Sequence, residues 1–191
     1  MDIYKNVKLV VFSLFLFNFI KAGEIEYYWS GAVTSESAVI SFATDKKAKI
    51  KIQYSDSKNF KKNKRYTNTT SVDEKSNFFA KDQLKDLKPS QTYYYRFNIN
   101  GTLKKDQVGK FKTHSNKPFS YKVTMATCAI TGSNNPVFDR IREEDSQFYL
   151  MLGDFHYGNV KKDCEDKLLA NFRSVLGSKK QSKLYNNVSI A

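Results

Sequence analysis

The stretch "LKPSQTYYYRFNINGT", residues 87–102, decides the fold of the first half of this 191-residue chain. A turn that carries Pro89 comes first, and Tyr93, Tyr95 and Phe97 then alternate with residues that face the other way. A period of two with one apolar side is typical of a half-buried β-strand. The "NGT" sequence at its end favours a tight turn into a hairpin partner. We therefore expect Tyr94 to point outward from this strand.

Other short segments around this strand show the same alternation. They are "SAVISF" at residues 37–42, "AKIKIQYS" at residues 48–55 and "VGKFKT" at residues 108–113. In the second of these, Ile50, Ile52 and Tyr54 face one way, and the alternating positions 49, 51 and 53 face the other. Several short strands at this spacing, without helical periodicity, predict an antiparallel β-sandwich over residues 23–117.

One motif within this sandwich resembles a known family. "LKPSQTYYYRF" is similar to the fibronectin type III pattern, in which a leucine, a proline and a tyrosine follow one another at this spacing. The resemblance implies a fibronectin III-like fold. It also implies that Tyr93 makes the tyrosine corner, in which the phenol bonds to the backbone a few residues upstream.

After Pro118 the pattern changes to strand, helix, strand. "FSYKVTMATC" and "FYLMLGD" read as strands, and between them Asn135 and Pro136 mark the start of a helix. A further helix in "CEDKLLANFRSVLGS" stops at Gly177, and "KLYNNVSIA" begins another β-like run. Two strands and two helices cannot cover both faces of a parallel sheet. Residues 118–191 are therefore expected to be the incomplete start of an α/β domain.

Polar side chains follow the two expected parallel strands. A right-handed crossover brings the carboxyl ends of both strands to one sheet edge, which places Cys128 near Asp154. With Tyr157 they form a set of sulfur and oxygen donors. A highly charged cation would stabilise the anionic forms of a thiol and a phenol, whose ordinary pKa values are about 8.5 and 10. The alternatives are a loop-capping role for Asp154 and simple packing for Tyr157.

The order of these motifs resembles the N-terminal part of metallophosphatases of the alkaline phosphatase D (PhoD) type. The shared features are the fibronectin-like domain beginning "YYWSGAVTSESAVISF", "MATC" ending one strand and "LGDFHY" ending the next. The resemblance implies an α/β metallophosphatase domain, Fe(III) bound by Cys128 and Tyr157, and Asp154 bridging iron and Ca²⁺. It implies a phosphate ester as substrate and Asp154 as a catalytic residue. His156 is the second catalytic candidate, as a contact for the substrate phosphate, with a merely exposed position as the alternative.

The sequence also departs from the pattern of this family. The later Asp, Asn and His ligands of the family have no counterpart here, so we expect a truncated chain that is inactive alone. The alternative is a non-catalytic secreted fibronectin-like binding module with a degenerate second domain. For Cys128 the alternative to metal binding is a disulfide with Cys164, because the two cysteines of a secreted chain would ordinarily pair with each other.

Composition and the first residues bear on location and partners. The formal net charge is +13, but no arginine-rich stripe or recognition motif is present, so nucleic-acid binding is not expected. Residues 1–22 have a basic start with Lys5 and Lys8, then an apolar run and a small residue at the end, which predicts a cleaved signal peptide and a secreted protein without a stable membrane span. An uncleaved membrane anchor is the alternative. Three glycosylation triplets fit the secretory route: Asn68, Asn100 and Asn187.

Overall fold

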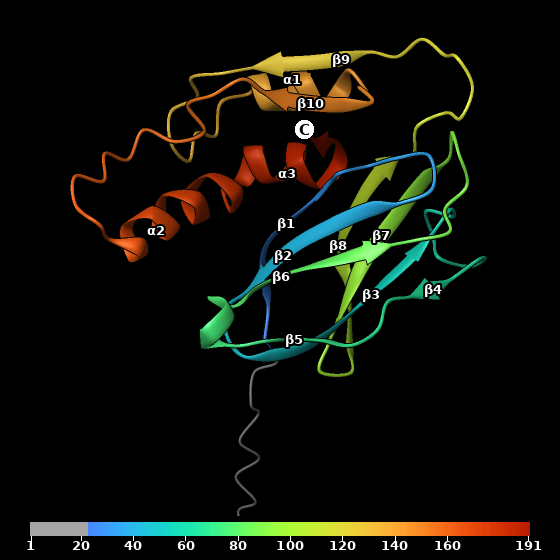
Figure 1. Ribbon diagram of the computed structural model, residues 1–191, viewed down its shortest axis with the longest axis horizontal. Helices are drawn as coiled ribbons and strands as arrows, with labels where there is room; N and C mark the ends of the chain where they lie inside the picture. Colours follow the sequence, from blue (N-terminus) through green and yellow to red (C-terminus); the bar gives the residue numbers. More distant parts are fainter. Residues whose placement is uncertain (1–22) are drawn as a thin grey trace, which may run out of the picture.

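The computed structural model describes residues 23–191, so the predicted signal peptide lies outside the described residues. The first part of this range is built from strands and one short 3₁₀ turn (Figure 1). They are β1 (Ile25–Gly31), β2 (Ala38–Thr44), β3 (Ala48–Ser55), β4 (Arg65–Tyr66), β5 (Thr70–Val72), η1 (Glu74–Ser76), β6 (Phe79–Leu84), β7 (Thr92–Ile99) and β8 (Thr102–Lys112).

These strands form the predicted antiparallel sandwich. One layer contains β6, β2 and β1, and the other has the order β4-β3-β7-β8, with β5 paired to β3. The inward side chains of the two layers make one apolar core, which includes Ile40, Phe42, Ile50, Ile52, Tyr95 and Phe97, each fully buried. The expected faces of β3 and β7 are therefore confirmed.

Tyr93 makes the predicted tyrosine corner. Its ring is buried, and its hydroxyl accepts a hydrogen bond of 2.9 Å from the backbone N–H of Lys88. The ring also stacks on Phe111 of the neighbouring strand, with the ring centroids 5.8 Å apart. The following hairpin turns at Asn100 and Gly101, which both have positive φ, as a type I′ turn requires.

The second part contains parallel strands and helices. Its elements are β9 (Val123–Ala126), α1 (Val137–Glu143), β10 (Phe148–Met151), α2 (Glu165–Leu176), α3 (Lys179–Asn187) and β11 (Ser189–Ile190). Strands β9, β10 and β11 are parallel, and the helix between the first two begins at Val137, one residue after the predicted first helical position. Asn135 Oδ1 accepts the N–H of Val137 at 3.0 Å. Helix α2 ends at Gly177, as predicted.

The prediction for the last residues was partly wrong. Residues 183–187 continue helix α3 and do not begin a strand, which is confined to Ser189–Ile190. The cause is a helical pattern of buried residues, since Gln181, Leu184 and Tyr185 are fully buried at spacings of three and four. Ser178 Oγ donates to the amide oxygen of Gln181 at 2.9 Å, so a polar residue occupies one core position of this helix.

The two parts share one sheet. Strand β11 pairs with β1 on one side and with β10 on the other, which gives a six-stranded order of β6-β2-β1-β11-β10-β9. Helix α3 lies between the β9–β10 pair and the sandwich and contacts β1, β8 and α1 (Figure 1). The boundary at residue 117 remains a prediction, because the sheet is continuous across the two parts.

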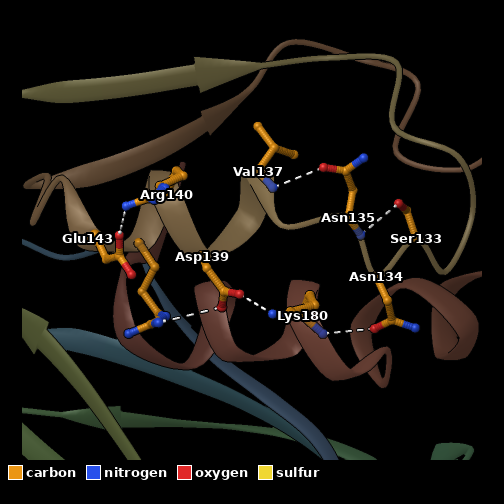
Figure 2. A network of polar contacts seen from close by, with 9 residues as sticks. Ser133, Asn134, Asn135, Val137, Asp139, Arg140, Glu143 and Lys180 are labelled. Carbon is orange, nitrogen blue, oxygen red and sulfur yellow. Dashed lines mark hydrogen bonds and ion pairs between the residues drawn. The ribbon is translucent and has the colours of Figure 1, made fainter.

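A polar network joins α1 to the start of α3 (Figure 2). Asp139 on α1 binds the ammonium group of Lys180 and the guanidinium group of Arg142. The backbone N–H of Lys180 donates to Asn134 Oδ1 at 3.0 Å. Hydrogen bonding and charge from Lys180 and Arg142 lower the pKa of Asp139, with the Lys180 hydrogen bond as the largest cause. The network therefore fixes α3 against the helix that connects β9 to β10.

Within residues 23–191, no helix is both long enough and apolar enough to cross a membrane.

Candidate metal centre

The carboxyl ends of β9 and β10 meet at one edge of the sheet, as the crossover rule predicts. Cys128 follows β9 and Asp154 follows β10. Both residues have a positive φ, 60° for Cys128 and 49° for Asp154, in a left-handed region that is costly for residues other than glycine. Both loops therefore leave their strands through a sharp turn at the residue that carries a candidate donor.

The three predicted metal ligands lie together. Asp154 Oδ2 is 3.3 Å from Cys128 Sγ, and it accepts a hydrogen bond of 3.1 Å from the Tyr157 hydroxyl. A single carboxylate oxygen thus contacts both other donors. All three residues are exposed, and half of the Tyr157 surface is open to solvent.

Two threonines position these donors, and sequence reasoning missed both of them. Thr127 Oγ1 donates to the carbonyl of Gly153 at 3.0 Å, which joins the two loops just before their donor residues. Thr131 Oγ1 accepts the backbone N–H of Tyr157 at 2.7 Å. The only sequence signal was the presence of hydroxyl residues beside Cys128, a common arrangement in loops.

The electrostatics of the cluster favour a cation. Interaction with Cys128 is the largest cause that raises the pKa of Tyr157, followed by loss of hydration and by the charge and hydrogen bond of Asp154. Without a cation, the phenol therefore keeps its proton and donates a hydrogen bond to the carboxylate. A bound cation would reverse this effect by offsetting the negative charge of a thiolate, a carboxylate and a phenolate at these distances.

His156 is directed elsewhere. Its imidazole packs edge-on against Phe172 of α2, with the ring centroids 5.1 Å apart. Its Nδ1 is buried, and among the residues that the structure describes it has no hydrogen-bond partner. His156 makes no hydrogen bond to the three clustered donors within this part of the chain, so its predicted contact with substrate phosphate stays a prediction.

The donor set suits a metal ion but is small. Both cysteines are free, with Cys128 exposed and Cys164 half-buried at the start of α2. Among the described residues, no three His, Cys, Asp or Glu side chains gather in one place, and Tyr157 is the third member of the cluster. One sulfur and two oxygen donors with partners at 3.1 and 3.3 Å fit an open, partial metal site.

The fold and the cluster thus define a β-sandwich protein in which a second, parallel part of the sheet carries a candidate metal site. Residues 29–115 match the family model described as "PhoD-like phosphatase, N-terminal domain". Over these residues the chain is similar to a PhoD-like N-terminal domain, and beyond them its likeness to PhoD is one of fold.

Solved structures extend this likeness in fold. The structure of PhoD superposes with a TM-score of 0.71 at 18% identity, covering 86% of this chain and 37% of that chain. The chain therefore spans little more than a third of the PhoD structure. The sensor domain of the anti-sigma factor RsgI4 from Pseudobacteroides cellulosolvens matches at 22% identity with a TM-score of 0.42, covering 49% of this chain and 76% of that chain.

A fibronectin type III domain from the human KIAA0970 protein matches at 14% identity with a TM-score of 0.37, covering 50% of this chain and 77% of that chain. No curated protein sequence matches this chain significantly.

Proposed function

We propose that this chain is part of a secreted, metal-dependent phosphoesterase that hydrolyses phosphate esters. Residues 118–191 would be the start of its α/β metallophosphatase domain. The observation that carries the proposal is the position of Asp154 Oδ2, which contacts both Cys128 Sγ and the Tyr157 hydroxyl at the shared end of two parallel strands. The PhoD-like N-terminal domain at residues 29–115 supports it independently.

Each residue of the cluster has a distinct role in this proposal. Cys128 and Tyr157 would hold Fe(III), and Asp154 would hold iron and Ca²⁺ together, since a carboxylate has two oxygens. The bound cations would supply positive charge for the phosphoryl oxygens and activate water for attack. Thr127 and Thr131 keep the two loops at a fixed separation, which such a site needs because misplaced donors lose affinity.

The cluster alone does not complete a two-cation site. Three protein donors leave most coordination positions of such a site unfilled. We therefore expect residues 23–191 alone to show neither phosphatase activity nor colour, with the further donors supplied by other polypeptide.

The test uses the full natural product of the gene, loaded with iron and calcium. Asp154→Asn is expected to remove bound iron and phosphatase activity together, because it weakens a donor shared by both cations. Tyr157→Phe is expected to remove the visible absorption that a phenolate gives when it binds Fe(III). Tyr121→Phe is the matched control, since Tyr121 is similarly exposed but lies before β9.

Two outcomes would contradict the proposal. One is iron content and activity that survive both site substitutions. The other is a gene product that ends at Ala191 and binds no iron, which would favour the non-catalytic binding module.

A further inference from the structure

The outer face of the sandwich, on the sheet that does not carry the metal cluster, contains a groove. Its volume is about 580 Å³, and it is lined by side chains of β3, β4 and β7 and of the loops beside them. Ile50 and Ile52 point into the core, so the residues that alternate with them point into this groove. The lining residues include Lys49, Lys51, Tyr66, Thr69, Asn98 and Asn100.

The groove carries positive charge without a counter-charge. Lys49 and Lys51 lie two residues apart on the same face of β3, so their ammonium groups extend from neighbouring positions. Within residues 23–191, neither side chain forms an ion pair, and no acidic residue lines the groove. A concave surface with one sign of charge raises the local concentration of anions.

An exposed aromatic ring is held in place beside these lysines. Tyr66 is 54% exposed, yet its hydroxyl is bound by the side-chain amide of Gln53, which is 2% exposed. The other atom of that amide, Oε1, accepts a 2.7 Å hydrogen bond from Arg96. The Arg96 guanidinium in turn lies 4.0 Å from the centre of the buried Phe60 ring. A chain of fixed polar groups thus orients a ring whose surface faces solvent.

Two asparagine amides complete the groove. Asn98 Nδ2 donates to the carbonyl of Gly101 at 3.2 Å, and Asn100 Oδ1 accepts the backbone N–H of Lys49 at 2.8 Å. These bonds fix both amides and leave Oδ1 of Asn98 for a ligand, whereas Nδ2 of Asn100 is the atom to which a glycan would be attached at the predicted triplet. The groove therefore offers one acceptor next to two cations and an aromatic face.

We propose that this groove binds an anionic saccharide, in which sulfate or phosphate groups are attached to sugar rings. The apolar face of a sugar ring packs on Tyr66, because an oriented aromatic ring offers a flat apolar surface at small entropic cost. The anionic group lies between Lys49 and Lys51, and a sugar hydroxyl donates a hydrogen bond to Asn98 Oδ1. The groove is on the sandwich, so this binding is independent of the proposed phosphoesterase activity.

The experiment measures binding of a heparin-derived tetrasaccharide by calorimetry. The protein is made in bacteria, so that the asparagines of the glycosylation triplets carry no glycan. The double variant Lys49→Gln/Lys51→Gln is expected to raise Kd at least ten-fold. The control, Lys161→Gln/Lys162→Gln, removes the same charge from an exposed loop before α2 and is expected to change Kd less than two-fold.

The ring and the anion are tested separately. Tyr66→Ala is expected to raise Kd about as much as the lysine pair, whereas Tyr66→Phe keeps the ring and most of the affinity. Inorganic sulfate and neutral dextran are expected to bind at least ten-fold more weakly than the tetrasaccharide. Equal losses in the two lysine pairs, an unchanged Kd in Tyr66→Ala, or equal affinity for single-stranded DNA of matched charge would overturn the proposal.

Discussion

Removal of the Tyr93 hydroxyl tests the tyrosine corner directly. Tyr93→Phe deletes the acceptor of the 2.9 Å hydrogen bond from the Lys88 N–H but keeps the ring that stacks on Phe111. A neutral hydrogen bond contributes about 0.5–1.5 kcal/mol, and an N–H left without a partner adds to the loss. Because the bond is only partly buried, water can in part replace the lost partner of the Lys88 N–H. We therefore expect the free energy of unfolding to fall by about 1–2 kcal/mol in total.

The assay is urea unfolding followed by the fluorescence of Trp29, the single tryptophan of the chain. A loss of this size lowers the urea concentration at the midpoint of unfolding, and it leaves unchanged the slope of the free energy of unfolding against urea concentration. In thermal unfolding it lowers Tm by about 2–4 °C per kcal/mol for a protein of this size. Tyr94→Phe is the control, because the Tyr94 hydroxyl makes no hydrogen bond within residues 23–191 and the side chain points outward. Equal losses in the two variants, or a loss below about 0.5 kcal/mol for Tyr93→Phe, would refute the reasoning.

Two further predictions concern packing and charge. Gly109→Ala would place a Cβ in steric overlap with the ring of buried Tyr95, so we expect a loss of about 1–3 kcal/mol in the same urea assay; a neutral result would show that the Tyr95 ring moves freely. The lowered pKa of Asp139 means that its ion pair stabilises the fold above the unfolded pKa of about 3.9, and that this contribution is lost as pH falls through the lower folded value. Thermal unfolding of Asp139→Asn should therefore depend less on pH between about 5 and 2, and an unchanged dependence would contradict the network of Figure 2.

The parts of the fold that were predictable are those with local patterns. The alternation of Ile50, Ile52 and Tyr54 has a direct cause in a sheet with one buried face. The meeting of Cys128 and Asp154 followed from the handedness of a crossover between parallel strands. In both cases the residues that define the pattern are close in sequence or are related by a general rule of chain topology.

The parts that were missed depend on distant contacts or on buried polar residues. Gln181 occupies a core position of α3, so the apolar pair Leu184 and Tyr185 looked like the beginning of a strand. The contact of His156 with Phe172 depends on how α2 packs against the loop, which no local pattern encodes. The pairing of β11 with β1 likewise could not be predicted from a local sequence pattern. The hydroxyls of Ser30 and Ser189 are 3.2 Å apart in the structure, but the two residues are separated by 159 positions in the sequence.

This last pairing has a consequence for the order in which the protein folds during synthesis. All strands of the sandwich have been synthesised once Lys112 is added, so its core can close before the rest of the chain is made, but Gly31 at the end of β1 has no strand partner on its second side until Ile190 is made. An uncovered strand edge is prone to pair with other chains, and contacts between distant residues form slowly. The nascent chain thus carries an exposed edge through the synthesis of some 75 residues, a period in which a chaperone that covers β1 would protect it from aggregation.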